Sequence, residues 1–126
     1  MEQNQRSQAR RKTSDYYLLY EPQNGELIGR LADISATGMK IISTEPLSRG
    51  VSLKCRLVFP EPVDDLTEIT IDTECVWCRE NERAGWYESG HVFKDLPEGE
   101  QAVISTLTRR ILTEETETRI AANANK

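Results

Sequence analysis

The chain has 126 residues, a formal net charge of −5, and a composition of 37% hydrophobic and 29% charged residues. This length is enough for one domain whose core needs no disulfide or metal support. No apolar run reaches the roughly 18 to 20 residues that span a bilayer, so membrane insertion is excluded. The polar N-terminus lacks the apolar centre of a secretory signal, and we therefore expect a cytoplasmic protein with reduced thiols.

The charge is unevenly distributed along the chain. Residues 1–12 carry four basic residues against one glutamate, a sum of +3, which leaves −8 for residues 13–126. A basic terminus is either an anion-binding arm, because guanidinium groups pair bidentately with phosphate oxygens, or a solubilising disordered end. We divide the chain into a flexible basic arm at residues 1–14, a folded domain at 15–112, and a polar tail or helix extension at 113–126.

The first half of the folded domain predicts three strands joined by tight turns. Residues 16–20 are aromatic and apolar, and an Asn-Gly pair then signals a hairpin before a returning strand at residues 26–34. Residues 35–38 form the next predicted turn, and a third strand follows at residues 39–44.

The second half predicts three further strands. Residues 51–59 alternate between apolar and polar side chains, and Pro60 and Pro62 are expected to end this strand. Residues 69–77 form the next strand, and residues 86–93 form the last one. One face of the fifth strand is expected to carry Ile69, Ile71, Thr73, Cys75 and Trp77.

A helix is predicted after the last strand. Asp95 is expected to cap it, with Glu98 three residues further on. Its apolar face is formed by Val103, Ile104, Leu107 and Ile111. An open twisted sheet would leave edges and one face exposed, so we predict an all-β fold: a small six-stranded antiparallel β-barrel with a C-terminal α-helix.

The cysteines do not predict a metal site. Cys75 and Cys78 stand three residues apart in a predicted strand, where such a pair points to opposite faces. Only Cys55 and His91 remain as further ligands, and no second CxxC or HxxxH is present. We therefore expect no metal.

Catalysis is also disfavoured by the sequence. Asp33, Ser35 and His91 are the residue types of a hydrolytic triad, but Ser35 lacks the strand-to-helix elbow of many such enzymes. No glycine-rich phosphate loop occurs either. We expect a protein that is not an enzyme, with Trp77 and Trp86 packing against the barrel or the helix rather than stacking on bases.

A second set of polar residues is suited to binding a phosphate or a nucleotide. Arg6 and Arg10 place two guanidinium groups four residues apart on the arm. Asp33 and Ser35 are alternate residues of a strand end and therefore share a face, and Gly38 lets another backbone come close. The alternative is a simple turn, in which Asp33 or Ser35 bonds local N–H groups and Gly38 supplies a positive φ.

An RxxxR pair in an arm, followed by (D/N)xSxxG between the second and third strands, resembles the PilZ domain family. The resemblance extends over residues 6–111, through the stretches Glu26–Ser35, Cys75–Arg79 and Gly90–Leu96. It implies a six-stranded barrel that binds cyclic di-GMP as a receptor or adaptor of bacterial second-messenger signalling, often as an intercalated dimer. No cofactor is implied, and cyclic di-GMP is the ligand.

The resemblance implies a set of ligand-binding residues: Arg6, Arg10, Asp33, Ser35 and Gly38, to which we add Arg11 as a further arginine of the arm. A second register of RxxxR begins at Arg11 and places Asp15 at the second arginine, where a carboxylate repels phosphate.

The alternative function is therefore a PilZ-like protein that has lost nucleotide binding and acts only as a protein-interaction adaptor. We expect a downstream protein partner that the sequence does not identify, and self-association as a homodimer stays open. Nucleic acid polymers are disfavoured by the acidic body of the domain.

Overall fold

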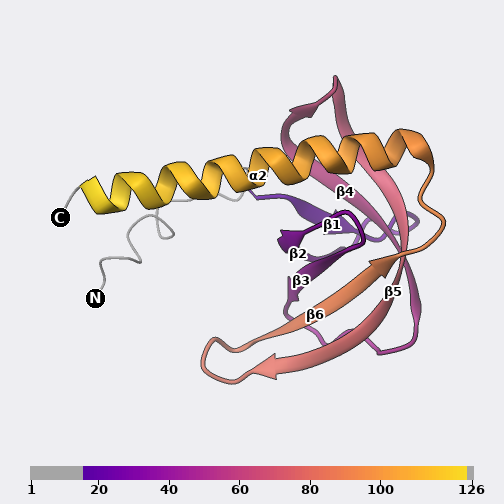
Figure 1. The fold of residues 1–126 in the computed structure, drawn as a ribbon. Coiled ribbons are helices and arrows are strands. Elements are labelled where there is room, and N and C mark those ends of the chain that lie inside the picture. Colours follow the sequence, from indigo (N-terminus) through magenta and orange to yellow (C-terminus); the bar gives the residue numbers. More distant parts are fainter. Residues whose placement is uncertain (1–15, 125–126) are drawn as a thin grey trace.

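A computed structural model describes residues 16–124, and their side chains as far as Leu112. Six antiparallel strands close into a barrel in the order β1-β2-β3-β6-β5-β4, and a helix follows (Figure 1). The elements are β1 (Leu18–Tyr20), β2 (Leu27–Ile34), β3 (Gly38–Ser43), β4 (Ser52–Val63), β5 (Leu66–Asn81), β6 (Trp86–Phe93) and α2 (Glu98–Ala124). The prediction of a six-stranded antiparallel barrel with a C-terminal helix is confirmed.

The barrel core follows from the alternation of side chains along each strand. Leu19, Ile41 and Leu57 are fully buried, because alternate residues of a strand face the interior. The three-residue strand β1 pairs with β2 on one side and with β4 on the other, and so completes the barrel.

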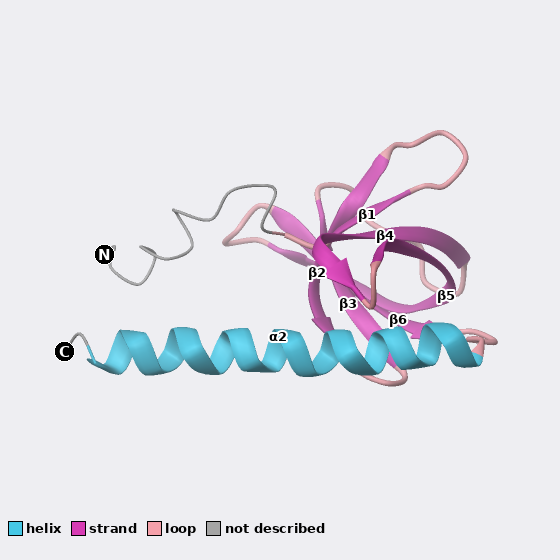
Figure 2. Cartoon of the chain, turned by 90° about the horizontal axis from the view of Figure 1, so that it is seen from above, coloured by secondary structure: helices cyan, strands magenta, loops and turns pink. Residues whose placement is uncertain are grey.

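The helix α2 packs on the barrel with its first half and extends past the strands with its second half (Figures 1 and 2). Val103, Ile104 and Leu107 are buried in the barrel core, as their spacing predicts. The prediction for Asp95 is wrong: the helix begins at Glu98, and Asp95 lies three residues earlier with a φ of 49°. No helix of the described chain is both long enough and apolar enough to cross a membrane.

The two prolines predicted to end the fourth strand lie inside it instead. Pro60 and Pro62 belong to β4, whose register with β5 shifts between Val58 and Val63. A proline has no N–H to donate to a neighbouring strand. It is tolerated here because the regular hydrogen-bond pairing of β4 with β5 is interrupted between Val58 and Val63. Asp64 and Asp65 then turn the chain with φ values of 51° and 67°, as a two-residue hairpin of the mirror-image type requires.

A second irregularity changes the face of several residues in β5. The register with β6 shifts between Cys75 and Trp77, so that Cys75 is buried while Trp77 is exposed. The expectation that Trp77 shares the inner face is therefore wrong.

The cysteine pair is also placed differently from the prediction. Cys75 and Cys78 both contact the backbone of Leu47: its N–H donates to Cys78 Sγ at 3.4 Å, and its carbonyl oxygen lies 3.9 Å from Cys75 Sγ. The prediction of opposite faces is thus wrong, because the extra residue of the bulge restores a common side. Burial raises the pKa of Cys75 and raises that of Cys55 to about 12. Within residues 16–112, no three His, Cys, Asp or Glu side chains form a metal-binding group.

Candidate functional site

The turn between β2 and β3 carries three of the residues predicted to bind a ligand. Asp33 at the end of β2 and Ser35 in the turn are exposed, and the buried Ile34 lies between them. Asp33 Oδ1 accepts a hydrogen bond from the N–H of Ile34 at 2.9 Å, and Ser35 Oγ accepts one from Thr37 at 3.3 Å. Both side chains face away from the barrel interior and retain lone pairs for a ligand.

Gly38 begins β3 and serves a close approach rather than a turn. The positive φ angles of glycines in the described chain occur at Gly25, Gly50 and Gly85. The expectation that Gly38 supplies a positive φ is therefore wrong. A Cβ atom at Gly38 would overlap the carbonyl oxygen of His91 in β6. Gly38 thus allows the backbones of β3 and β6 to meet at the candidate site.

A row of outward-facing positions crosses four strands beside this turn. Asp33 of β2 opposes Lys40 of β3. Lys40 opposes Gly90 of β6, which in turn opposes Trp77 of β5. Neighbouring strands lie about 4.8 Å apart, so the row is roughly 14 Å wide. It places a carboxylate, an ammonium group and an indole on one outer surface of the barrel.

The indole of Trp77 lies directly on Gly90. A Cβ atom at position 90 would overlap the indole Nε1, so only glycine leaves room for the ring on this strand. The residue Trp77 is 36% exposed, and the Arg79 guanidinium lies over its ring, with Cζ 5.2 Å from the ring centroid. Trp77 therefore packs on the outside of the barrel and remains partly exposed.

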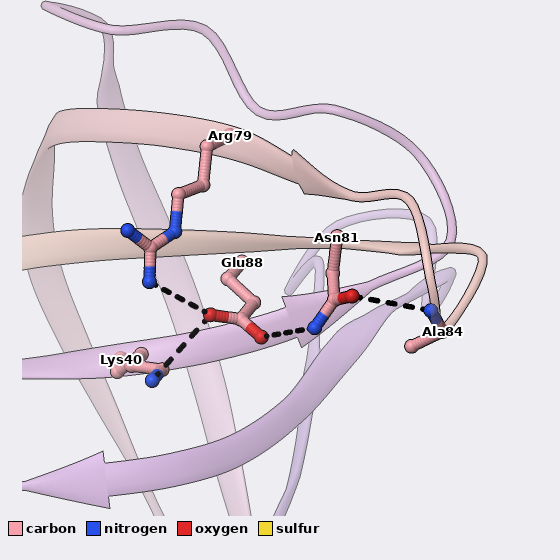
Figure 3. A network of polar contacts seen from close by, with 5 residues as sticks. All are labelled: Lys40, Arg79, Asn81, Ala84 and Glu88. Atoms are coloured by element: carbon pink, nitrogen blue, oxygen red, sulfur yellow. Dashed lines mark hydrogen bonds and ion pairs between the residues drawn. The ribbon is translucent and has the colours of Figure 1, made fainter.

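Glu88 organises the charges in the next row of the same surface (Figure 3). Its carboxylate lies 3.5 Å from Lys40 Nζ and 3.4 Å from Arg79 Nη2, and it accepts a hydrogen bond from Asn81 Nδ2 at 3.0 Å. The Asn81 amide, followed by the Lys40 ammonium group, lowers the pKa of Glu88 to about 2 although partial burial opposes this. Glu88 is therefore ionised at neutral pH and fixes both cations near the Trp77 ring.

An aromatic stack lies at the edge of this surface where the described chain begins. The Arg30 guanidinium lies over the rings of Tyr16 and Trp86, with Cζ at 4.8 Å and 5.6 Å from their centroids. Tyr17 is buried and meets the Phe59 ring edge-on at 6.4 Å. Tyr16, one residue earlier, is therefore on the outside of the barrel, beside β2.

The remaining predicted residues are Arg6, Arg10 and Arg11, together with Asp15 of the alternative register. All of them lie outside the described residues. The structure thus brings Asp33, Ser35 and Gly38 together at the junction of β2 and β3, and the docking of the arginines stays a prediction.

His91 is separated from the residues that resemble a triad. Its side chain is buried in the barrel, and Nε2 lies 2.9 Å from the buried Ser89 Oγ. Asp33 and Ser35 are exposed on the outer surface. Burial lowers the pKa of His91 to about 4, so the imidazole is neutral at physiological pH. This placement gives His91 a structural role and makes no hydrolytic triad with Ser35.

A cleft of about 580 Å³ lies behind the turn, between the turn and α2. Ala36 and Thr37 form its wall on the turn side, while Gln101, Ser105 and Arg109 form its wall on the helix side. The Thr37 carbonyl oxygen also accepts a hydrogen bond from the N–H of Phe93 at the end of β6. Residues of the turn and of α2 therefore line opposite sides of the same cleft.

Three residues of this surface were not predicted as site members: Lys40, Trp77 and Arg30. The alternation of β3 indicates that Lys40 faces outward, between the buried Met39 and Ile41. The pairing of β3 with β6 brings Trp77 within reach, and this pairing joins segments about 50 residues apart. A sequence alone carries no signal for that register.

The comparisons agree with this fold. The family described as PilZ domain matches residues 4–110. K. pneumonia MrkH in complex with c-di-GMP is similar with a TM-score of 0.66 and 24% identity, over 82% of this chain and 49% of that one. Escherichia coli YcgR in complex with c-di-GMP gives a TM-score of 0.58 and 18% identity, over 88% and 46%.

The Bacillus subtilis inhibitor of motility (MotI/DgrA) gives a TM-score of 0.59 and 21% identity, over 82% of this chain and 52% of that one. The chain thus spans about half the length of these solved structures. No curated protein sequence matches it.

Proposed function

Because the chain belongs to the PilZ domain family, we propose that it is a receptor for cyclic di-GMP and catalyses no reaction. One observation carries the proposal. Asp33 and Ser35 are exposed on the outer surface of the barrel, and Tyr16, the first described residue, contacts Arg30 on the outside of the same strand, β2. The similarity to MrkH and YcgR structures that contain c-di-GMP supports it.

The proposed ligand is held between the basic arm and the outer surface of the barrel. Arg6 and Arg10, with Arg11, bind the phosphates or the O6 and N7 atoms of guanine, because the guanidinium fork matches both. Asp33 accepts hydrogen bonds from guanine N–H groups, and Ser35 adds a hydroxyl contact. These roles follow from the chemistry of each side chain.

Lys40 and Trp77 extend the proposed site across the barrel. The ammonium group of Lys40 is available to a phosphate oxygen, since its side chain is 38% exposed beside Glu88. The exposed part of the Trp77 ring offers a stacking surface for a base. The row from Asp33 to Trp77 therefore presents contacts to both the charged and the planar parts of a cyclic dinucleotide.

Calorimetric titration with cyclic di-GMP tests the proposal. A charge-assisted contact contributes about 1.5 to 3 kcal/mol, so Arg10→Ala and Asp33→Ala should each weaken binding by roughly tenfold to a hundredfold. Arg83→Ala is the matched control, because Arg83 is an exposed arginine in the loop between β5 and β6. An affinity of Arg10→Ala equal to that of the unchanged chain rejects the role of Arg10.

The rival function is a PilZ protein that works only through protein contacts, and Asp15 motivates it. A ligand that binds only the native state must raise the midpoint of thermal unfolding. If saturating cyclic di-GMP changes neither this midpoint nor the amide chemical shifts of residues 33–38, the adaptor function replaces the receptor function. In both cases we propose that the protein acts through a downstream protein partner.

A further inference from the structure

We propose that the cleft between the β2–β3 turn and α2 binds a segment of the downstream protein partner in which an acidic side chain stands beside an apolar one. Such docking deepens the proposed function, because it rests on the proposal that this protein acts through a partner. It adds the surface that the partner contacts and the chemistry of the segment that fits it. Binding in the cleft does not require cyclic di-GMP and can be measured without it.

The cleft combines a polar helix face with apolar side chains of the barrel. Gln101, Ser105 and Arg109 follow one another at intervals of four residues, so they lie on one face of α2. Phe93 and Leu96 also line the cleft, and both are partly buried residues that pack against the barrel core. A segment that enters the cleft therefore meets hydrogen-bond donors and an apolar surface at the same time.

Arg109 supplies the positive charge of the cleft. Its Nη1 donates to Ser105 Oγ at 3.0 Å, which uses only part of the donor capacity of the guanidinium group. Among the side chains that the structure describes, no carboxylate forms an ion pair with Arg109. The Ser105 hydroxyl accepts the bond from Arg109 and keeps its own proton to donate. A carboxylate in the cleft can therefore accept hydrogen bonds from both residues.

The other polar side chains of the helix wall are engaged within α2 and its N-terminal approach. Gln101 Nε2 donates to the Leu96 carbonyl oxygen at 2.8 Å, and Thr108 Oγ1 donates to the Ile104 carbonyl oxygen at 2.8 Å. Arg109 and Ser105 are thus the main donors that remain for an occupant. One cation beside an apolar surface suits a single carboxylate joined to an apolar group, because further anionic groups would find no partner there.

The exposure of the cleft favours a protein segment over a free small molecule. Most of the lining residues are exposed: Ala36, Thr37, Gln101, Ser105 and Arg109. Sites for small ligands usually bury most of the ligand surface, whereas an occupant of this cleft of about 580 Å³ stays in contact with solvent on its outer side. A segment that belongs to a larger partner is covered on that side by the partner itself.

The acidic charge of the domain makes a peptide selection informative. Residues 13–126 have a formal charge of −8, so non-specific attraction favours basic peptides. The probe is a phage-displayed library of short random peptides, selected on the full chain without cyclic di-GMP. Selected peptides should carry Asp or Glu next to an apolar residue, and they should shift the amide signals of residues 36–37, 93–96 and 101–109. If no peptide is selected, or if the selected peptides are basic or shift other residues instead, the proposal is overturned.

Charge changes at Arg109 test the contact with the carboxylate. Arg109→Gln should weaken binding of a selected acidic peptide roughly tenfold or more, the effect of losing one charge-assisted contact. Arg109→Glu should abolish binding of this peptide and allow binding of a version with lysine in place of the acidic residue. Equal affinities of the unchanged chain and Arg109→Gln overturn the proposal.

Arg110→Gln is the matched control for the loss of one positive charge on the same helix turn. Arg110 does not line the cleft, and its Nη1 donates to the Glu61 carbonyl oxygen in β4 at 3.2 Å. This variant should bind the acidic peptide with unchanged affinity. An equal loss in Arg110→Gln and Arg109→Gln would mean that only net charge matters, which overturns the assignment to the cleft.

A bulky side chain in the cleft tests the location of the peptide. Ser105 is exposed, so Ser105→Trp should leave the barrel folded, as circular dichroism can confirm, and should block the acidic peptide. Unchanged peptide binding by the folded variant overturns the proposal. A chain that binds cyclic di-GMP but no acidic peptide keeps the receptor function and loses the docking site. A chain that binds acidic peptides in the cleft but no cyclic di-GMP keeps the docking site and has the adaptor function.

Discussion

At the scale of single residues, glycine decides where the candidate surface can be built. Gly38 and Gly90 differ from the glycines of the turns, because neither needs a positive φ. Gly38 makes room for the His91 carbonyl group, and Gly90 makes room for the Trp77 ring. At both positions the absence of a side chain allows another group, a backbone carbonyl or an indole ring, to approach the backbone closely.

This reading predicts opposite effects for two glycine-to-alanine changes. Gly38→Ala should lower the free energy of unfolding by about 1 to 3 kcal/mol, because its Cβ overlaps the backbone of β6. Gly99→Ala meets no atom within 4 Å and lies in the first turn of α2, so it should raise stability by roughly 0.5 to 1 kcal/mol. Urea unfolding of both variants checks this, and a stable Gly38→Ala protein contradicts it.

At the scale of the elements, the sequence predicted the strands and the helix but not their irregularities. Alternation over residues 51–59 and the apolar spacing from Val103 to Ile111 are strong local signals, and both elements formed. The bulge between Cys75 and Trp77 leaves no trace in composition, since one extra residue shifts the faces without changing residue types. The prediction that Pro60 and Pro62 end the strand was wrong for a similar reason. The shift in pairing between Val58 and Val63 accommodates both prolines, and the sequence gives no sign of this shift.

Only those residues of the candidate site that lie close together in the sequence could be predicted. Asp33, Ser35 and Gly38 lie within six positions and follow a recognisable pattern, so they were identified from the sequence. Lys40 and Trp77 meet through the register of three strand pairs. Registers between distant strands depend on the packing of the whole barrel, which no short motif encodes.

The attachment of α2 leads to a prediction at the same scale. Leu107 is fully buried against the barrel, so Leu107→Ala should lower the free energy of unfolding by about 2 to 5 kcal/mol. Leu112, one and a half turns further on, is 61% exposed, and Leu112→Ala should change stability by less than about 0.5 kcal/mol. Thermal unfolding followed by circular dichroism measures both. Equal losses would mean that the helix is held beyond Ile111.

At the scale of the whole molecule, the pH dependence of stability should reveal the buried His91. Burial lowers its pKa from 6.5 to about 4, whereas the unfolded chain binds a proton near pH 6.5. The unfolded state therefore holds the extra proton between these values, and stability is lost as the pH falls from 6.5 to about 4. The shift corresponds to a loss of about 3 kcal/mol.

Urea unfolding at several pH values measures this loss. His91→Gln removes the titrating group and should flatten the profile between pH 6.5 and 4, compared with the unchanged chain. Glu88 adds a loss of its own at the acidic end of this window, because the unfolded carboxylate binds a proton near pH 4.5 whereas the Asn81 amide and the Lys40 ammonium group hold its folded pKa at about 2. Both proteins contain Glu88, so this loss cancels when their two profiles are compared. Parallel profiles for the two proteins would contradict the assignment to His91.

The short strand β1 has a consequence for the molecule as a whole. Its three residues pair with β2 on one side and with β4 on the other, and the basic residues 1–14 precede it in the sequence. A ligand that binds these basic residues should therefore also affect β1, which is the shortest strand of the barrel. Local opening of β1 can be measured as amide hydrogen exchange at Leu18 to Tyr20. This exchange should become slower when a ligand binds the arm and faster when the ligand dissociates.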